Sequence, residues 1–360
     1  MSSSSGQRVP SHQEAAVLQN QGPKFYFETQ KLAIPTIKRQ EVLVELEVTG
    51  FCGTDLSLAH GYLGPCLTIL GHEGVGRISA VGSLCTSEAA TVGRLAGVGW
   101  IRDACGSCRV CDNDIQDETR CLEQVFSGRD VPGTLARYTV VPERYITPLP
   151  DGVPSEMLAP VVCAGATGYK ALKLANLAAG SWVGISGAAG AVGSLTLSYA
   201  KHMGYRPIAI DGGERQRLLC MEAGAEVYLD FEKEDSLRSA MLLKTEGKLC
   251  SAIIVCAGAV TAYDEALNCL DYHGTLVAVG IPPPTSKISL FPLFLIDYGI
   301  RIVGSIAGGR VDIAEAAEFV RKGLVKPRVT EIGIHELKSY ARRVNELDGK
   351  LVVRLGANVG

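Results

Sequence analysis

The sequence predicts an α/β protein with two domains, a β-rich domain of short strands and a doubly wound parallel sheet. Its 360 residues exceed what one ordinary hydrophobic core holds. Up to about residue 160, short segments alternate polar and apolar residues, and from about residue 163 apolar runs alternate with amphipathic helical segments. We therefore expect one domain at 1–162, completed by 304–360, and the other at 163–303.

The first domain is predicted from half-buried strands. EVLVELEV, at 41–48, alternates charged and apolar residues with a period of two, as a strand with one buried face does. The segments 76–81 and 136–141 follow the same pattern. Glycines and prolines separate these segments, so we expect a small barrel-like arrangement of short strands.

The second domain is predicted from strands and helices that alternate along the chain. Apolar strands are expected at 181–187, 206–211, 226–230, 251–258, 274–280 and 301–306. Helices are expected at 165–177, 191–203, 214–224, 234–246 and 261–270. This alternation is typical of βαβ units, whose parallel sheet is covered by helices on both faces. A helix at 311–323 and a strand at 350–355 would return to the first domain.

Charge and composition restrict the partners. The formal net charge is −3 and no basic stripe occurs, which argues against nucleic acid or an anionic membrane as a partner. The N-terminal segment lacks the apolar region of a secretory signal, and no run of about 18 apolar residues occurs. We therefore expect a cytoplasmic protein. Twelve cysteines in that reducing compartment argue against a disulfide framework. Six of them are expected to be buried thiols: Cys66, Cys85, Cys220, Cys250, Cys256 and Cys269.

A glycine loop predicts a nucleotide site in the second domain. Gly187, Gly190 and Gly193 lie between an expected strand and an expected helix, where they permit a tight turn and close backbone approach. The helix N-terminus then offers free N–H groups to a pyrophosphate. Asp211 ends the next strand, where a carboxylate accepts hydrogen bonds from ribose hydroxyls and repels a 2′-phosphate, so NAD is favoured over NADP. The alternative is a βαβ unit whose glycines serve packing alone.

Four cysteines within seventeen residues predict a structural metal site. Cys105, Cys108 and Cys111 form a CxxCxxC run, and Cys121 can close a tetrahedron around Zn²⁺. Four thiolates leave no open position, and binding would order a long loop that has little core of its own. Redox chemistry is the weaker alternative.

A second, different metal site is predicted around Cys52 and His72. A catalytic zinc takes three protein ligands and keeps one position open, and Cys163, near the expected domain junction, is the candidate for the third. Asp55 is expected to accept the ring N–H of His72. Thr54 offers a hydroxyl that can relay a proton.

The sequence leaves the roles of two further residues, Glu73 and His60, open. Glu73 is expected either to support the ligands or to bind the metal transiently. His60 lies near in sequence and is as readily a packing residue as a functional one.

Together these motifs resemble one family. CGTDL, GHEGVG, the CxxCxxC run, PVVCAGATGYKALK and SWVGISGAAGAVGSLTLSYAKHMGYRPIAIDGGE resemble zinc-dependent medium-chain alcohol dehydrogenases, most closely the yeast-type fungal branch. The similarity covers nearly the whole chain after the N-terminal tail. It implies a GroES-like catalytic domain and a Rossmann coenzyme domain, with a homotetramer, or a homodimer, as the assembly. It also assigns Ala191, Val192 and Val279 to the coenzyme site.

Several positions depart from the family pattern. Ser57 stands where many members have the histidine that ends the proton relay, and Gly53 replaces a residue that often touches the coenzyme phosphate. Lys350 stands where an arginine commonly binds the pyrophosphate, and a lysine lacks the bidentate fork. Leu63 replaces a bulky tryptophan of the substrate pocket, whereas Trp100 retains its counterpart. A substrate larger than ethanol is therefore expected.

The four-cysteine loop is also longer than the family pattern, with two extra residues before Cys121. This lengthening makes the structural zinc the less secure of the two metal expectations.

The resemblance implies hydride transfer between NAD and an alcohol, aldehyde or ketone, with the substrate oxygen held at a zinc. Two alternatives remain open on the sequence. One is an NADPH-dependent carbonyl or double-bond reductase of the same fold without catalytic zinc. The other is a protein that binds zinc and nucleotide without catalysis.

Overall fold

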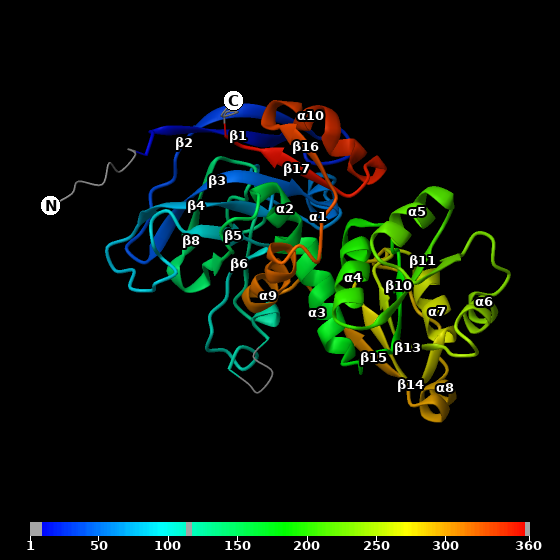
Figure 1. Ribbon diagram of the computed structural model, residues 1–360. Coiled ribbons are helices and arrows are strands. Elements are labelled where there is room, and N and C mark those ends of the chain that lie inside the picture. Colours follow the sequence, from blue (N-terminus) through cyan, green and yellow to red (C-terminus); the bar gives the residue numbers. More distant parts are fainter. Residues whose placement is uncertain (1–8, 113–116, 357–360) are drawn as a thin grey trace. The chain divides into compact units, whose positions relative to one another are not determined.

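Residues 9–112 and 117–356 are described by the computed structural model, in which the chain forms two units (Figure 1). Unit 1 comprises Met1–Cys163, Gly309–Arg321 and Pro327–Gly360, and unit 2 comprises Ala164–Gly308 and Lys322–Lys326. The α/β class predicted from the sequence is confirmed, with a mainly antiparallel sheet in unit 1 and a parallel sheet in unit 2.

Unit 1 is built on strands from both ends of the chain. Its strands are β1 (His12–Gln19), β2 (Tyr26–Ala33), β3 (Glu41–Phe51), β4 (Gly74–Val81), β5 (Leu95–Val98), β6 (Ile101–Asp103), β7 (Val125–Phe126), β8 (Tyr138–Pro142), β9 (Thr147–Pro148), β16 (Val329–Gly333) and β17 (Lys350–Arg354). Its helices are α1 (Gly53–Ala59), α2 (Ser155–Pro160), α9 (Arg310–Arg321) and α10 (Leu337–Tyr340).

β3 is the central strand of this unit. Among the described residues the main sheet runs β16-β17-β3-β4-β5-β9, and β8 also pairs with β3. Val42, Val44, Leu46 and Val48 of β3 are buried, as the predicted period of two requires for one face. β17, about 300 residues further along the chain, pairs antiparallel with β3, so the C-terminal strand completes the sheet of unit 1 (Figure 1).

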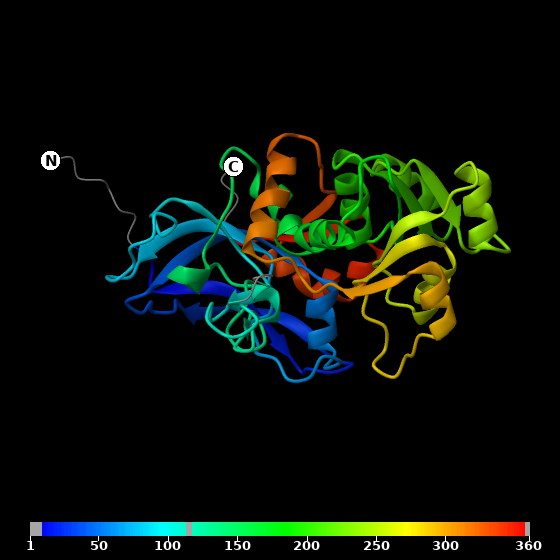
Figure 2. The ribbon, with the colours of Figure 1, turned by 90° about the horizontal axis from the view of Figure 1, so that it is seen from below.

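Unit 2 contains the doubly wound sheet, with the strand order β12-β11-β10-β13-β14-β15. Its strands are β10 (Trp182–Ser186), β11 (Arg206–Asp211), β12 (Val227–Asp230), β13 (Cys250–Val255), β14 (Leu270–Ala278) and β15 (Arg301–Gly304). Its helices are α3 (Ala166–Ala175), α4 (Ala191–His202), α5 (Glu214–Glu222), α6 (Leu237–Lys244), α7 (Val260–Asn268) and α8 (Pro292–Tyr298). Figure 2 shows helices beside both faces of this sheet.

The strand order changes direction at β10. β10 pairs in parallel with β11 on one side and with β13 on the other. In open parallel sheets, a ligand binds beyond the carboxyl ends of the strands at such a switch point. The loop after β10 carries the three glycines, so the sheet topology and the glycine motif indicate the same position for a ligand.

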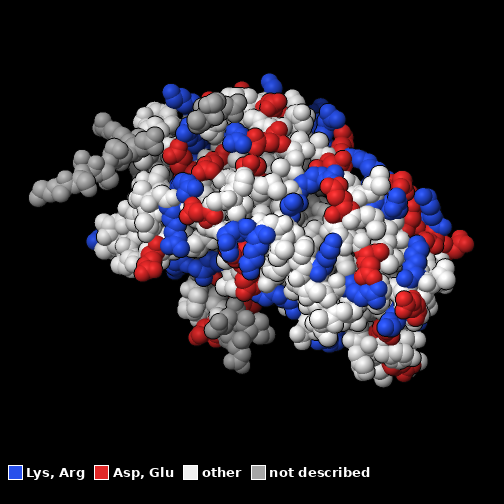
Figure 3. Space-filling model, in the orientation of Figure 1, with Lys and Arg blue, Asp and Glu red and all other residues white. Residues whose placement is uncertain are grey.

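The surface of the described residues is of mixed character. On the face drawn in Figure 3, basic and acidic side chains are interspersed. Over residues 9–112 and 117–356, no helix combines the length and the apolar character that a membrane crossing demands.

Candidate active site and metal centres

The register of the unit 1 sheet brings the first group of predicted residues together. β3 and β4 pair with Thr49 opposite Gly74, so the residues that follow β3 lie beside those that precede β4. Cys52 follows β3 as the N-cap of α1, and His72 lies two residues before β4. Two ligands that are twenty residues apart in sequence thus meet at one end of the sheet.

The third predicted ligand joins them from the turn between α2 and α3. Cys163 lies in the helical turn Val161–Gly165. One donor atom from each of Cys52, His72, Glu73 and Cys163 lies within 4.8 Å of every other. Sulfur atoms 52 and 163 are therefore close enough to share a single ion, which is what the sequence hypothesis requires.

Asp55 connects the helix and the ligand loop. Its carboxylate has no exposed surface, and it accepts the backbone N–H of Cys52 at 3.0 Å and of Gly71 at 2.9 Å. His72 Nδ1 lies 3.1 Å from Asp55 Oδ1. A carboxylate at Nδ1 selects the tautomer in which Nε2 carries the free lone pair, and so fixes which nitrogen can face a metal.

His72 Nε2 is buried and has no hydrogen-bond partner among the described residues. Burial lowers the pKa of His72, but the charge and hydrogen bond of Asp55 and the neighbouring Cys52 outweigh it, and the net direction is upward. The pKa of Cys52 is lowered, first by a hydrogen bond with Cys163. A ring nitrogen without a hydrogen-bond partner, in a group that also holds two thiols, fits a Zn²⁺ ligand set of two thiolates and one imidazole.

Lys350 lies beside this cluster because Leu351 of β17 pairs with Phe51 of β3. Its Nζ is 2.5 Å from Glu73 Oε1, and only 5 % of its surface is exposed. Burial raises the pKa of Glu73 to about 8, although the positive charge of Lys350 opposes the shift. Lys350 is predicted from the sequence to contact the coenzyme pyrophosphate, and its ion pair with Glu73 is not expected from that prediction. The pyrophosphate contact stays a prediction.

The predicted relay and pocket residues lie around the cluster. Thr54 and Ser57 are both on α1, three residues apart, so they share one face of the helix. The Trp100 ring lies 5.3 Å from the His72 ring, edge to face, and 4.9 Å from the Phe126 ring, stacked. Leu63 packs against the unit 1 core. His60 stacks on Tyr62 at 5.0 Å, and this contact favours the packing role.

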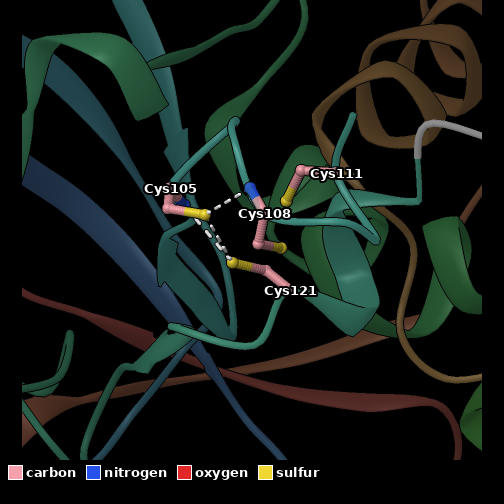
Figure 4. Close-up of side chains that lie close together, drawn as sticks. All are labelled: Cys105, Cys108, Cys111 and Cys121. Atoms are coloured by element: carbon pink, nitrogen blue, oxygen red, sulfur yellow. Dashed lines mark hydrogen bonds between the residues drawn. The ribbon is translucent and has the colours of Figure 1, made fainter. Parts of the chain in front are cut away.

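The second metal group is the four-cysteine loop (Figure 4). Sγ atoms of Cys105, Cys108, Cys111 and Cys121 all lie within 4.8 Å of one another. The backbone N–H groups of Cys105 and Glu123 each donate to Cys121 Sγ at 3.3 Å, and that of Cys108 donates to Cys105 Sγ at 3.3 Å. Donated N–H bonds stabilise thiolates, the form that binds zinc.

The electrostatic environment differs between two of these sulfurs. Backbone hydrogen bonds, first that of Leu122, lower the pKa of Cys108 to about 6, whereas burial raises that of Cys111 to about 12. The two additional residues predicted before Cys121 fall in a loop whose positions 113–116 lie outside the described residues.

The glycine loop of unit 2 has the geometry of a phosphate cradle. Gly187 has φ +71°, which a residue with a Cβ rarely adopts, and a Cβ on Gly193 would overlap the Gly187 carbonyl. Gly190 is the N-cap of α4, and Ala191 and Val192 form its first turn, where N–H groups have no partner within the helix. An anion fits at this position.

Asp211 is held at the end of β11. Its Oδ2 accepts the N–H of Ala189 at 2.8 Å and its Oδ1 accepts that of Gly212 at 2.9 Å. Both oxygens retain a lone pair for a ribose hydroxyl. Val279, which follows β14, donates its N–H to the Val255 carbonyl at 3.1 Å, so it lies at the same carboxyl edge of the sheet.

Fold and site together define a two-unit dehydrogenase with a soft-ligand metal cluster in one unit and a dinucleotide loop in the other. Sequence comparisons agree. Residues 38–151 match the alcohol dehydrogenase GroES-like domain, and residues 191–322 match the zinc-binding dehydrogenase family.

Alcohol dehydrogenase 2 of Emericella nidulans is 33 % identical over 96 % of this chain and 98 % of its own length. An alcohol dehydrogenase of Geobacillus stearothermophilus is 34 % identical over 92 % of this chain and 96 % of its own. This chain therefore belongs to the medium-chain, zinc-binding alcohol dehydrogenase family, and the predicted resemblance is confirmed.

A solved structure is also similar. The acetophenone reductase of Geotrichum candidum, in complex with NAD, matches with a TM-score of 0.81 and 25 % identity, over 97 % of this chain and 98 % of that one. The family shows alcohol and carbonyl oxidoreduction with a nicotinamide coenzyme as the class of reaction.

Proposed function

We propose that this chain is a zinc-dependent, NAD-linked alcohol dehydrogenase or carbonyl reductase whose substrate is larger than ethanol. The observation that carries the proposal is the convergence of Cys52, His72 and Cys163, together with a His72 Nε2 that is buried and has no hydrogen-bond partner among the described residues. A buried polar atom without a hydrogen bond lowers the stability of a protein. A protein that had lost its catalytic metal would therefore have no reason to leave this ring nitrogen without a partner.

The residues around the cluster have distinct tasks in this proposal. A bound zinc would supply Lewis acidity at the substrate oxygen. Asp55 holds the His72 ring and the first turn of α1 in one arrangement. Thr54 takes the hydroxyl proton of the alcohol, and Ser57, one helical turn further, passes it through water towards solvent. In the direction of oxidation, an alcohol and NAD⁺ give a carbonyl compound, NADH and one proton.

Preference for NAD is supported by Asp211, whose carboxylate is fixed by two backbone N–H groups at the position of the ribose hydroxyls. A 2′-phosphate there would meet a negative charge. The similar acetophenone reductase was solved with NAD, which agrees with this preference and with a ketone among the substrates. Leu63 in place of a larger side chain supports a roomy pocket.

Assembly as a homotetramer or homodimer is part of the proposal. α8 has no buried residue, and Leu293 and Ile296 on it are 66 % and 75 % exposed. β15 is the edge strand of its sheet. An unpaired strand edge beside a large apolar helix surface is typical of a subunit contact.

The decisive experiment follows NADH absorbance over primary, secondary and aromatic alcohols, with zinc content measured on the same sample and NADP⁺ tested in parallel. Cys163→Ala should lose turnover by at least 10³-fold, because a ligand of the catalytic ion is gone, while NAD binding, measured by calorimetry, stays unchanged. Cys66→Ala, a change at a thiol outside both clusters, is the control. Full turnover in Cys163→Ala would overturn the zinc assignment, and faster turnover with NADP⁺ would overturn the coenzyme assignment.

A further inference from the structure

A buried arginine without an acidic partner lies in unit 1, outside both cysteine clusters. Arg102, on β6, is only 4 % exposed. Its guanidinium donates from Nε to Ser127 Oγ at 3.2 Å, from Nη1 to Thr139 Oγ1 at 2.9 Å and to the Val140 carbonyl at 2.6 Å, and from Nη2 to the Pro132 carbonyl at 3.1 Å. All four acceptors are uncharged, so the positive charge is solvated by dipoles alone.

The two acidic residues in the lining of the neighbouring cavity, Asp103 and Glu41, already have basic partners. Asp103 accepts two bonds from Arg144, at 2.8 and 2.6 Å. Glu41 accepts the backbone N–H of Lys38 at 2.8 Å and lies 3.7 Å from its ammonium group. Burial lowers the pKa of Arg102 to about 10, which leaves it charged at neutral pH. A buried cation without a counter-charge is costly and is rarely retained without a purpose.

Arg102 lines a cavity with a volume of about 480 Å³. This volume is within the range of small-molecule sites. The walls come from β1, β2, the first residue of β3, β6, β7 and β8 and from neighbouring loops, all of them in unit 1. Leu32, Ile69, Val131 and Val140 give much of the lining an apolar character.

A second donor lines the same cavity. Gln13, 6 % exposed, accepts the backbone N–H of Tyr138 with its Oε1 at 2.6 Å, which identifies the other atom of the amide as the donor nitrogen. Among the described residues this nitrogen has no hydrogen-bond acceptor. A guanidinium has five N–H groups, and Arg102 uses four of them, so one N–H on Nη2 is also free.

We propose that this cavity is a binding site for a small organic carboxylate with an apolar chain. One carboxylate oxygen takes the remaining N–H of Arg102 and the other takes the amide of Gln13, which supplies the missing negative charge. The chain of the acid contacts the apolar walls. The site is separate from the metal cluster and does not depend on the proposed reaction.

Hexanoate is the probe, titrated calorimetrically into the full-length zinc-loaded protein. We expect one molecule to bind in the cavity, with hexanamide and acetate each at least tenfold weaker, because one lacks the charge and the other lacks the apolar chain. Equal affinity for hexanoate and hexanamide would refute a site built around a buried cation.

Two variants locate the binding while leaving Arg102 in place. Ala33→Trp enlarges an exposed residue of the lining and so reduces the space. Gln13→Glu keeps the acceptor for Tyr138 but replaces the free donor with a second negative oxygen. Each should weaken hexanoate at least tenfold, with alcohol turnover unchanged in Ala33→Trp. Arg39→Gln, an exposed arginine outside the lining, should change the affinity less than twofold. Hexanoate that binds both variants as tightly as the parent protein occupies another place, such as the metal cluster, and the proposal fails.

Discussion

Glu73 has no exposed surface, and a glycine makes the space that its carboxylate fills. A Cβ on Gly50 would overlap Glu73 Oε2. Gly50 also donates its N–H to the Glu73 carbonyl at 3.0 Å. The position of this acid beside the metal ligands thus depends on a residue with no side chain of its own.

Gly50→Ala should therefore displace Glu73 and strain the end of β3. We expect a loss of about 1–3 kcal/mol in the free energy of unfolding, as for other overpacked sites, and at least tenfold lower turnover. Urea unfolding and NADH formation measure the two effects. Gly53→Ala is the matched control, because nothing lies within 4 Å of its added methyl group and the residue is exposed on a helix. Equal behaviour of the two variants would contradict the steric argument.

Some of the individual residues of the site could be predicted from the sequence. Cys52, His72 and Cys163 were predicted as one cluster because a catalytic zinc takes three protein ligands, and Cys163 follows the predicted β-rich domain near its junction with the second domain. The pairing of Glu73 with Lys350 could not be predicted in this way. It depends on the register of β17 against β3, which long-range packing sets and local patterns do not encode.

Among the elements, the four-cysteine loop is connected to α9 by one acidic residue. Glu118 Oε1 accepts the backbone N–H of Arg310 at 2.7 Å, and Oε2 accepts its Nε at 3.1 Å and its Nη2 at 2.9 Å. The Arg310 guanidinium also lies over the Tyr145 ring, 4.6 Å from its centre. The loop is thus attached to the N-terminal end of a helix that is nearly 200 residues further along the chain.

Glu118→Gln keeps the size of the side chain but removes its charge and the bidentate contact. We expect a loss of about 1 kcal/mol in the free energy of unfolding, because the pair is partly exposed. In protein loaded with zinc, we also expect the four-cysteine loop to release the ion faster to a chelator. Chromogenic chelation kinetics check this. Glu318→Gln, which breaks an exposed pair with Arg321 on the same helix, should leave zinc release unchanged. Identical release rates in both variants would contradict the proposed connection.

A pH-dependent contact lies at the end of β12. Asp230 Oδ1 accepts the N–H groups of Gly213 and Glu232 at 3.2 Å, and Lys233 lies 3.2 Å from Oδ2. Burial raises the pKa of Asp230, but these contacts outweigh it and the net direction is downward. A lowered folded-state pKa means that the contribution to stability is present above the unfolded pKa of Asp and is lost as the pH falls through the folded one.

Asp230→Asn should remove part of the acid sensitivity of unfolding. At pH 7 the variant should be less stable than the parent protein, and the difference should shrink as the pH falls below the unfolded pKa of Asp towards the lowered folded one, because the parent carboxylate then takes up a proton on unfolding. Chemical unfolding at several pH values measures this. A constant difference across the range would show that Asp230 contributes through something other than its charge.

The parallel sheet could be predicted because its buried strands form apolar runs between amphipathic helices, whereas shorter elements could not. The helix expected at 165–177 ends at Ala175, since Asn176 adopts a left-handed conformation with φ +50°. α8 was not predicted. Its helix has only seven residues, and Pro292 and Asp297 interrupt the apolar segment. Phe294, Leu295 and Tyr298 pack against the core of unit 2, but none of them is fully buried, so the helical periodicity is too short and too weak to be recognised.

At the scale of the whole molecule, we expect the exposed helix α8 to form a contact between subunits. Ile296→Glu should shift the protein to a smaller species in light scattering coupled to size exclusion, because a charge in an apolar contact is not solvated. Leu243→Glu, at an 84 % exposed position on α6, serves as control and should leave the mass unchanged. A parent protein that is already monomeric at micromolar concentration would refute the proposed assembly.

The pairing of β17 with β3 has a consequence for biosynthesis. Residues 52 and 72 are synthesised early, yet the strand that lies beside them and provides Lys350 is made about 280 residues later. On a ribosome that adds roughly 5–20 residues per second, the nascent chain carries Glu73 without its lysine partner for many seconds. Cys52, His72 and Cys163 are all synthesised before Lys350, so the buried ion pair beside them is the last part of this cluster to form.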